Sequence, residues 1–332
     1  MYLSGAFAGV LLAFSSVLSV AEAGTIRHDR DPQHYLSYAG APDFASAGLF
    51  RITRNEPGFT GSGVLVGDRW VLTAGHLLEG TTGMSFTVGG QEYAAEGWVS
   101  HPRFDGDLRK GYDLGLVKLA TPVTGVAPAG LYRARDEQNQ VATLVGFGRT
   151  GDGLAGGQPF SEIDFLGRAG TNVVDGTADA RLGFGHYKPK LPKGARTFVT
   201  DFDHPTDPTA SATGDSAPTD LELLIAQGDS GGPVYLSGTN GPLVAGIHSF
   251  GEFTDERDDS DYGDVTGHTR VSVLRPWIEK TMRRGDLGRN VPMFINAPAA
   301  RELFVPVAVP EPATAGVGAL LLLVLRRRRP RA

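Results

Sequence analysis

The chain of 332 residues contains no cysteine. This absence excludes disulfide bonds, thiol nucleophiles and thiolate metal sites, so an exported form must rely on its core and hydrogen bonds for stability. Lysine and arginine are also missing before Arg27, which leaves the N-terminal region without a basic side chain. With 41% hydrophobic and 20% charged residues, the composition is ordinary for a globular protein with a sizeable core.

Glycine and proline are abundant by contrast, and 46 Gly and 21 Pro separate short apolar runs. This punctuation favours many strands and turns. One helix is expected at residues 274–284, with Pro276 in its first turn and Gly285 as its stop, and the polar segment 201–220 is expected to be an exposed loop. The runs that predict strands are LFRITR, SGVLVG, RWVLTA, MSFTVG, LGLVKLA, VATLVGFG, LVAGIHSFG and HTRVSVL.

The N-terminal 23 residues have the pattern of a signal peptide. An apolar run, Ala6 to Val20, precedes Ala21-Glu22-Ala23, which fits an A-x-A cleavage site and predicts a mature start at Gly24. Residues 24–47 would then form an N-terminal segment. The alternative is a buried N-terminal helix.

The C-terminal residues 310–332 combine Pro310-Glu311-Pro312, an uncharged apolar run at 313–325 and five arginines. Such a run reaches only about 20 Å as a helix, against about 30 Å of bilayer hydrocarbon. The arrangement resembles the PEP-CTERM sorting signal of Gram-negative bacteria. That resemblance implies export, transient inner-membrane anchoring, processing by an exosortase-type sorting enzyme, and a final location in the periplasm, at the cell surface or in the extracellular matrix. A plain tail anchor is the alternative, and residues 285–309 would be a linker.

The net charge also limits the classes of binding partner. Residues 1–23 and 313–332 hold five of the 31 basic residues and one of the 37 acidic residues, so residues 24–312 carry 26 basic and 36 acidic groups. A net charge of −10 argues against nucleic acid or an anionic membrane surface as the partner.

The acidic stretch DERDDSDYGD, residues 255–264, is the densest cluster of carboxylates. It could bind a hard cation such as calcium, but it lacks a recognisable spacing of ligands, and a solvated loop is the alternative. No metal and no cofactor is assigned from the sequence.

Three polar residues stand out beside apolar strands, in the chain order His76, Asp113 and Ser230. A serine hydroxyl is a poor nucleophile at neutral pH and needs a base within hydrogen-bond reach, a task that suits histidine. A carboxylate behind the imidazole fixes the required tautomer. The order His, Asp, Ser is one of those in which such triads occur, so the three residues are candidates for acyl transfer to water.

The motifs WVLTAGH, HPRFD...YDLGLVKLATPV, VGFGRTG, QGDSGGPV, VAGIHSFG and GHTRVSVLRPWI occur in that order. Together they resemble the chymotrypsin-like (trypsin-type) serine protease family over residues 48–282. The resemblance implies an all-β fold of two packed six-stranded Greek-key barrels, about 48–135 and 136–270, plus the helix 274–284, in a domain spanning 48–284.

Carried over by motif, the resemblance implies a serine endopeptidase that acts on polypeptides, with His76 as general base, Asp113 as its orienting carboxylate and Ser230 as nucleophile. The N–H groups of Gly228 and Ser230 would form the oxyanion hole. Ser249 matches the serine that supports the catalytic aspartate, and Phe250 and Gly251 match the strand that pairs with substrate.

The sequence departs from the family pattern in two respects that matter for function. No family-type activated N-terminus is visible, so Asp229 needs either a new N-terminus near Gly24 to Ile26 or another cation or hydrogen bonds. Leu224 stands where an acid would select a basic side chain in the S1 pocket, which holds the residue before the cleaved bond (P1). We therefore expect apolar or small P1 residues, with Thr266 narrowing the pocket.

Two other classes of protein compete with this interpretation. GDSGG also fits the G-x-S-x-G elbow of α/β-hydrolase esterases, with His248 or His268 as base, although that elbow must lead into a helix and Pro233 follows here. A non-catalytic surface module with a protease fold is the second alternative.

Overall fold

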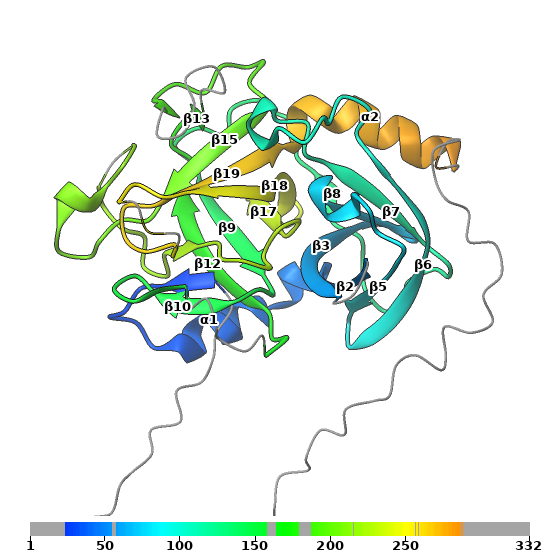
Figure 1. Ribbon diagram of the computed structural model, residues 1–332, viewed down its shortest axis with the longest axis horizontal. Helices are drawn as coiled ribbons and strands as arrows, with labels where there is room; N and C mark the ends of the chain where they lie inside the picture. The colour runs from blue at the N-terminus through cyan, green and yellow to red at the C-terminus, as the bar shows by residue number, and fades with distance from the viewer. Residues whose placement is uncertain are drawn as a thin grey trace, which may run out of the picture. The chain divides into compact units, whose positions relative to one another are not determined.

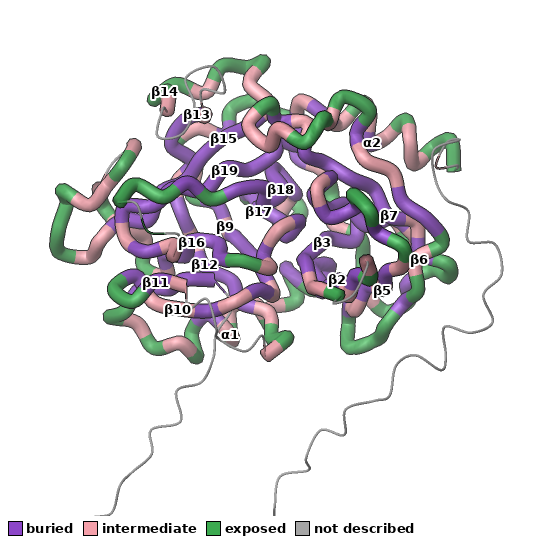
Figure 2. The backbone as a smooth tube through the Cα atoms, in the orientation of Figure 1, coloured by how far each residue is buried: buried purple, intermediate pink, exposed green. Residues whose placement is uncertain are grey.

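A computed structural model describes residues 24–54, 58–157, 164–178, 187–214, 216–255, 257, 259–285 and 287. Figure 1 shows two β-structures side by side, with a long helix near the end of the described chain. Buried residues follow the strands of both, and exposed residues follow the connecting loops (Figure 2). The fold is mostly β, as the sequence predicts.

The first β-structure is a closed six-stranded antiparallel barrel. Side chains of β5 alternate between half-buried and buried along its whole length, the period-2 pattern of a strand with one face in a core. Short 3-10 helices, η2 (His76–Leu78) and η3 (Leu108–Lys110), lie in its loops. In barrel order the strands are β2 (Ala47–Thr53), β3 (Phe59–Gly67), β4 (Trp70–Thr73), β7 (Gly115–Leu119), β6 (Gln91–Ser100) and β5 (Gly83–Val88).

The second β-structure is a seven-stranded sheet, in which β8 (Gly130–Leu131) pairs with β18 outside the main path. The family resemblance predicts a second six-stranded barrel, but within the described residues no ladder joins the edge strands β12 and β15. The Asn172 side-chain amide instead donates to the carbonyls of Asp201 (2.7 Å) and Leu223 (3.2 Å) between them. The path runs β12 (Arg168–Val173), β9 (Val141–Gly146), β17 (Pro233–Leu236), β18 (Leu243–Glu252), β19 (Val265–Arg270) and β15 (Thr197–Asp201).

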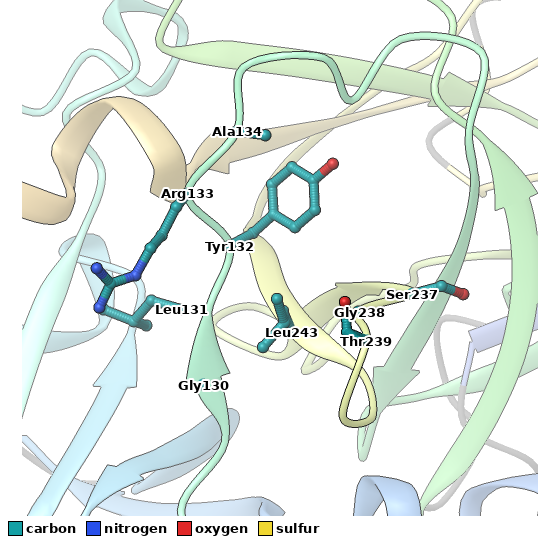
Figure 3. Close-up of a pocket in the computed structure, with 9 residues that line it drawn as sticks. All are labelled: Gly130, Leu131, Tyr132, Arg133, Ala134, Ser237, Gly238, Thr239 and Leu243. Carbon is teal, nitrogen blue, oxygen red and sulfur yellow. The ribbon is translucent and has the colours of Figure 1, made fainter.

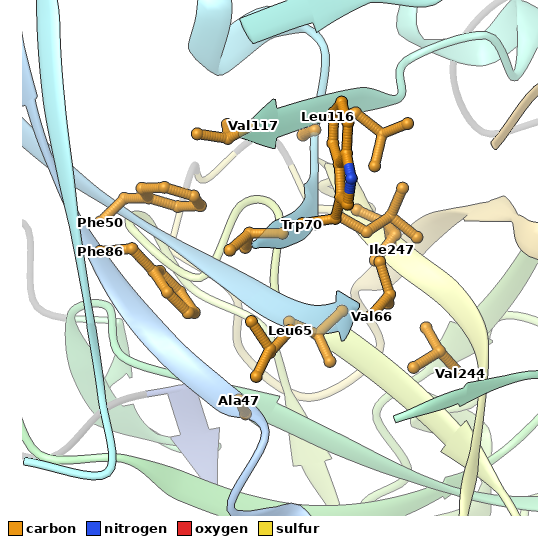
Figure 4. Close-up of a cluster of buried hydrophobic side chains, with 14 of the residues drawn as sticks. Ala47, Phe50, Leu65, Val66, Trp70, Phe86, Leu116, Val117, Val244 and Ile247 are labelled. Atoms are coloured by element: carbon orange, nitrogen blue, oxygen red, sulfur yellow. The ribbon is translucent and has the colours of Figure 1, made fainter. Parts of the chain in front are cut away.

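One of two hydrophobic clusters is shared by the barrel and the second sheet. Phe50 and Phe86 pack inside the first barrel with ring centroids 4.7 Å apart, and Figure 4 shows Val244 and Ile247 of β18 joining the same cluster. All four side chains are fully buried. The shared core fixes the barrel against the second sheet, which is a condition for any site built from loops of both.

The N-terminal segment docks on the second sheet. Strand β1 (Gly24–Ile26) pairs in parallel with β10 and antiparallel with β16, so that Thr25 lies opposite Leu224. Helix α1 (Pro32–Ala39) follows, capped by the Asp31 carboxylate, which accepts a hydrogen bond from the N–H of Gln33. The remaining short elements are η1 (Pro42–Phe44), β10 (Thr150–Asp152), β11 (Gly156–Gly157), β13 (Thr177–Ala178), β14 (Tyr187–Lys188), η4 (Pro208–Ala210) and β16 (Leu223–Leu224).

The long helix α2 spans Val271–Arg284 and begins three residues before the expected start at 274. Val271 belongs to this helix, not to a strand, because its side chain and that of Ile278 pack into the shared core. Pro276 consequently lies inside the helix instead of in its first turn. The end is as predicted, since Gly285 adopts φ +68° and caps the helix.

The signal peptide at 1–23 and the sorting signal at 310–332 both lie outside the described residues, and so does almost all of the linker 285–309. Across the part of the chain that is described, no helix combines the length and apolar character that a membrane span requires.

Candidate active site

His76 and Asp113 meet at the ends of two paired strands. Because β4 pairs with β7, with Thr73 opposite Gly115, the residues just beyond this end of the ladder lie together. The Nδ1 of His76 is 2.8 Å from Oδ2 of Asp113, and the backbone N–H of His76 donates to Oδ1 at 2.8 Å. Since a carboxylate accepts at Nδ1, the proton of a neutral ring lies there and the Nε2 lone pair is available.

The carboxylate of Asp113 is fully buried and is held from the second sheet. The Ser249 hydroxyl donates to Oδ2 at 2.6 Å, which places Ser249 where the family resemblance predicts it. The Thr269 hydroxyl donates to the backbone carbonyl of Asp113 at 2.8 Å, a contact that the sequence analysis missed. The bond from Ser249 stabilises a charge that burial would otherwise penalise, and the bond from Thr269 holds the backbone that carries it.

Ser230 lies in the loop between β16 and β17, which docks on the first barrel. The Ser62 N–H donates to the carbonyl of Ser230 at 2.8 Å, and its hydroxyl donates to the carbonyl of Gly228 at 3.2 Å. Gly231, at φ +85°, is pressed so closely that a Cβ there would lie 2.1 Å from Thr73 Oγ1 and 3.0 Å from Leu77 Cδ1. The nucleophile loop therefore lies against the residue that follows His76.

On either side of Asp229, this loop has a backbone donor without a protein acceptor among the described residues. The N–H groups of Asp229, Gly231 and Gly232 all donate within the structure. Among the described residues, those of Gly228 and Ser230 donate to no protein acceptor, and the Ser230 hydroxyl makes no hydrogen bond to His76. Two unengaged amides on either side of a buried Asp229 are the arrangement that can receive an anionic oxygen.

The carboxylate of Asp229 has backbone partners. Its two oxygens accept hydrogen bonds from the N–H groups of Gly148 and Ala226, each at 2.7 Å. Burial raises the pKa of Asp229 to about 6, and these two bonds and the charge of Arg168 oppose the rise. The nearby backbone N–H of Gly24 donates to the carbonyl of Arg149. Of the partners considered from the sequence, this structure contains the hydrogen bonds and, in Arg168, a cation whose charge acts on the carboxylate.

The predicted substrate-binding residues occupy two sheets. Thr266 lies in β19 directly opposite Gly251 of β18, and Thr266 is buried while Gly251 is exposed. Phe250 is buried, and its ring lies close to Gly267. Leu224 is buried in β16, in the four-stranded sheet that contains β1.

The arrangement around Ser230 is not that of an esterase elbow. Ser230 is followed by strand β17, whereas the elbow requires a helix. The two alternative bases, His248 and His268, are fully buried and hydrogen-bonded to each other, with Nδ1 atoms 3.1 Å apart. Neither ring is exposed to act as a base.

The acidic stretch is more buried than a solvated loop would be. Asp255, Asp261 and Asp264 have carboxylate oxygens within 4.8 Å of one another, and burial raises the pKa of Asp264 to about 7. Arg257 pairs with Asp255 and Asp261, and both oxygens of Asp264 accept backbone N–H bonds. Arg257 and backbone N–H groups of the protein thus already bind the three carboxylates that could also hold a cation.

Acidic residues expected in an exposed loop are also buried. Asp201 and Asp203, at the start of the segment 201–220, are buried together with Glu222 and Asp175. Burial is the main cause that raises the pKa of Asp175 to about 10 and that of Glu222 to about 8.

A separate hollow of about 520 Å³ lies elsewhere (Figure 3). Tyr132 at its centre donates a hydrogen bond to Asp136. Its lining consists of Gly130, Leu131, Tyr132, Arg133, Ala134, Ser237, Gly238, Thr239 and Leu243, and includes none of the candidate site residues.

The sequence matches a known protein family and is similar to a known trypsin. The family described as Trypsin matches residues 45–161 and 204–278, which is more than half of the chain. A trypsin from Phaedon cochleariae is 34% identical over 104 residues, a match that covers 26% of this chain and 40% of that protein. The chain thus spans well under half the length of that relative.

Two solved structures have a similar fold. A structure titled HL collagenase has a TM-score of 0.52 and 20% identity, covering 73% of this chain and 94% of the other. Neuropsin, a serine protease expressed in the limbic system of mouse brain, has a TM-score of 0.50 and 21% identity, covering 73% and 96%.

Proposed function

Because the chain belongs to the trypsin family of serine endopeptidases, we propose that it hydrolyses peptide bonds through His76, Asp113 and Ser230. The observation that carries the proposal is the 2.8 Å contact between His76 Nδ1 and Asp113 Oδ2, supported by Ser249 at 2.6 Å. This contact leaves Nε2 of His76 as the free base, and the Ser230 loop is docked beside it.

In the proposed reaction, Ser230 Oγ attacks the peptide carbonyl while Nε2 of His76 takes the hydroxyl proton. The C–N bond then breaks, and the same proton passes to the leaving amine. Water repeats the sequence on the acyl-enzyme and releases the carboxylic acid and free Ser230. Asp113 remains ionised and stabilises the imidazolium that forms in each step.

The negative charge on the carbonyl oxygen would be received by the N–H groups of Gly228 and Ser230. Both amides lack a protein acceptor among the described residues, and Gly228 is fixed at φ +102°. Preorganised donors of this kind are worth roughly 10²–10³ in kcat each.

The test of the mechanism uses a serine-directed phosphonate and a peptide substrate. Wild-type protein should be labelled at Ser230, while Ser230→Ala should not be labelled, and both Ser230→Ala and His76→Ala should lose turnover by about 10⁴-fold or more without unfolding. An unlabelled, inactive wild-type protein would favour a non-catalytic surface module instead.

For specificity, we propose apolar or small P1 residues. Leu224 offers no counter-charge to a basic side chain, and Thr266 would narrow the pocket opposite Gly251. Cleavage of a mixed peptide library should be enriched in such residues. Dominance of Arg and Lys at P1 would contradict this specificity and leave the mechanism untouched.

We further propose that residues 1–23 direct export and are then removed, and that the protein is anchored transiently through 313–325 and processed near Pro310-Glu311-Pro312 by an exosortase-type enzyme. The order of tripeptide, short apolar run and arginine cluster supports this. Intact-mass analysis of the exported protein should show loss of the residues beyond that tripeptide. A mature chain still ending at Ala332 would indicate a plain anchor.

A further inference from the structure

Two buried histidines form a hydrogen-bonded chain across the second sheet. His248 of β18 lies directly opposite His268 of β19, and their Nδ1 atoms are 3.1 Å apart. The Nε2 of His248 is 3.2 Å from the carbonyl of Val145 in β9, and the Nε2 of His268 is 3.2 Å from Thr200 Oγ1 in β15. Both rings are fully buried, and the chain connects four strands.

The position of each proton follows from the partners. The carbonyl of Val145 can only accept, so His248 carries its proton on Nε2 and accepts at Nδ1. His268 must then donate from Nδ1, which leaves its Nε2 to accept from the hydroxyl of Thr200. This single arrangement uses every donor and acceptor in the chain while both rings are neutral.

Each ring precedes a residue that holds Asp113. Ser249, after His248, donates to the Asp113 carboxylate at 2.6 Å, and Thr269, after His268, donates to its backbone carbonyl at 2.8 Å. Successive side chains on a strand point to opposite faces. Thr269 therefore lies on the face of β19 opposite to the His268 ring. Ser249 lies at a bulge of β18, between His248 opposite His268 and Phe250 opposite Gly267, so the paired rings fix the position in the ladder at which this bulge begins.

His248 also anchors the nucleophile loop through its backbone. Its N–H donates to the carbonyl of Gly232, and its carbonyl accepts from the N–H of Gly231, each at 2.9 Å. A Cβ on Gly232 would lie 2.7 Å from Cδ2 of the His248 ring, so ring and loop are in close contact.

We propose that the His248–His268 pair is a positioning device that sets the relative placement of Asp113 and the Ser230 loop. The proposal rests on the proposed function of these residues in peptide hydrolysis. An apolar pair could fill the same space, but it would lack the directional ring-to-ring hydrogen bond that the two histidines add to the backbone ladder between β18 and β19. The strands around the two rings and the Ser230 loop also carry charged residues. Within the described chain none of them is hydrogen-bonded to either ring: Asp201, Glu252, Arg270 and Asp229.

The first test is independent of catalysis. Long-range ¹H–¹⁵N spectra of the wild-type protein at neutral pH should show two neutral rings, protonated on Nε2 in His248 and on Nδ1 in His268. Any other tautomer pair, or rapid exchange of those protons with solvent, would overturn the proposal. This result holds whether or not Ser230 proves to be catalytic.

The second test compares His268→Leu with His268→Asn, measured by phosphonate titration and peptide hydrolysis. Leu keeps the volume and removes the donor, whereas the Asn amide can donate from the position of Nδ1. We expect kcat to fall about three- to tenfold in the Leu variant and to recover largely in the Asn variant, with KM within twofold in both. His34→Leu, at an exposed histidine of α1, is the control.

Equal kcat in wild type and His268→Leu, or equal losses in the Leu and Asn variants, would show a packing role only and overturn the proposal. Should the Leu variant fail to fold, Thr200→Val and Thr200→Ser ask the same question at the end of the chain. The kcat of Thr200→Val should fall below that of wild type, whereas the kcat of Thr200→Ser should stay close to it. Equal kcat values in the two variants would count against the proposal. Turnover that survives Ser230→Ala would instead refute the proposed function, and the tautomer test would still stand.

Discussion

The carboxylate of Asp229 accepts the N–H of Gly148 at 2.7 Å, across the two loops that lie behind the candidate nucleophile. A second bond from the N–H of Ala226 holds its other oxygen, and a Cβ on Gly146 would lie 2.0 Å from its Oδ1. The loop that carries Ser230 is thus tied to the strand ends of β9 by a buried carboxylate that is bonded to backbone amides.

The ionisation of Asp229 should make the free energy of unfolding depend on pH. Its folded pKa of about 6 lies above the ordinary value, so the folded state holds the proton more tightly than the unfolded chain does. Stability is therefore highest below the ordinary pKa and is lost as pH rises towards 6, by about 3 kcal/mol from this group.

Urea unfolding of wild type and Asp229→Asn between pH 4 and 7 measures this contribution. The Asn variant should be less stable throughout, because its NH₂ group faces an N–H donor, at a cost of about 1–3 kcal/mol. The difference between the two proteins should also shrink as pH rises through 6. A constant difference would show that Asp229 does not titrate in this range.

The sequence predicted the parts of the site that have local patterns. His76 and Asp113 each follow or precede a strand of strong apolar character, and Ser230 lies in a glycine-rich loop, so motif and spacing were enough to name them as candidates. The structure brings His76 and Asp113 within 2.8 Å of each other. The placement of β1 between β10 and β16 was not predictable, because Gly24 to Ile26 have no periodicity and the pairing joins residues about 200 apart in the chain.

Two other differences have local physical causes. Val271 to Leu274 resemble a strand by β-branched composition, but the chain turns directly into α2 because Val271 and Leu274 pack against the shared core. The segment 201–220 is polar enough to predict exposure, yet Asp201 is buried because its Oδ2 accepts from the N–H groups of Ala212 and Thr213. Composition does not reveal which loop amides a carboxylate will meet.

Ser249 is expected to be a positioning residue whose removal lowers kcat. Ser249→Ala removes a hydrogen bond to a buried carboxylate, so kcat should fall by roughly tenfold or more while KM changes little. Ser249→Thr keeps the hydroxyl and should recover part of the loss. Ser85→Ala, at a half-buried serine of β5 in the first barrel, is the control. Unchanged turnover in Ser249→Ala would mean that Asp113 is held by Thr269 and the His76 N–H alone.

Gly231 should tolerate no side chain. At φ +85° with Thr73 Oγ1 2.1 Å from a would-be Cβ, Gly231→Ala combines backbone strain with a steric clash and should cost about 2–4 kcal/mol of unfolding free energy. Gly241→Ala, at φ +109° with no atom within 4 Å, isolates the strain alone and should cost about 1–2 kcal/mol. Equal losses measured by denaturant titration would argue against the close docking of the Ser230 loop on β3 and β4.

The buried histidines should make the protein labile in acid. Burial lowers the pKa of His248 to about 3 and that of His268 well below its ordinary value, so the unfolded chain binds protons that the folded chain does not. Stability from these groups is fully present above about pH 6.5 and falls as pH drops towards 3, by about 1.4 kcal/mol per pH unit for each ring.

Comparison of wild type with the double variant His248→Leu, His268→Leu tests this slope, and His34→Gln controls for loss of an exposed histidine. The double variant should lose stability less steeply between pH 6 and 4, whatever its stability at neutral pH. Parallel curves for all three proteins would show that neither buried ring contributes to acid lability.

Removing one partner of the buried ion pair between Glu137 and Arg270 should reduce the free energy of unfolding more than removing both. Both side chains are fully buried, the guanidinium Nε donates to Glu137 Oε1 at 2.9 Å, and Ser272 donates to the same oxygen at 2.6 Å. Glu137→Leu leaves a buried cation without its counter-charge and should cost about 3–5 kcal/mol, whereas adding Arg270→Met should restore a large part of it. Glu96→Ala, which breaks an exposed pair with Arg69, should cost under about 1 kcal/mol. Additive losses in the double variant would mean that the two charges do not stabilise each other, and that the junction of β19 with α2 is held by packing alone.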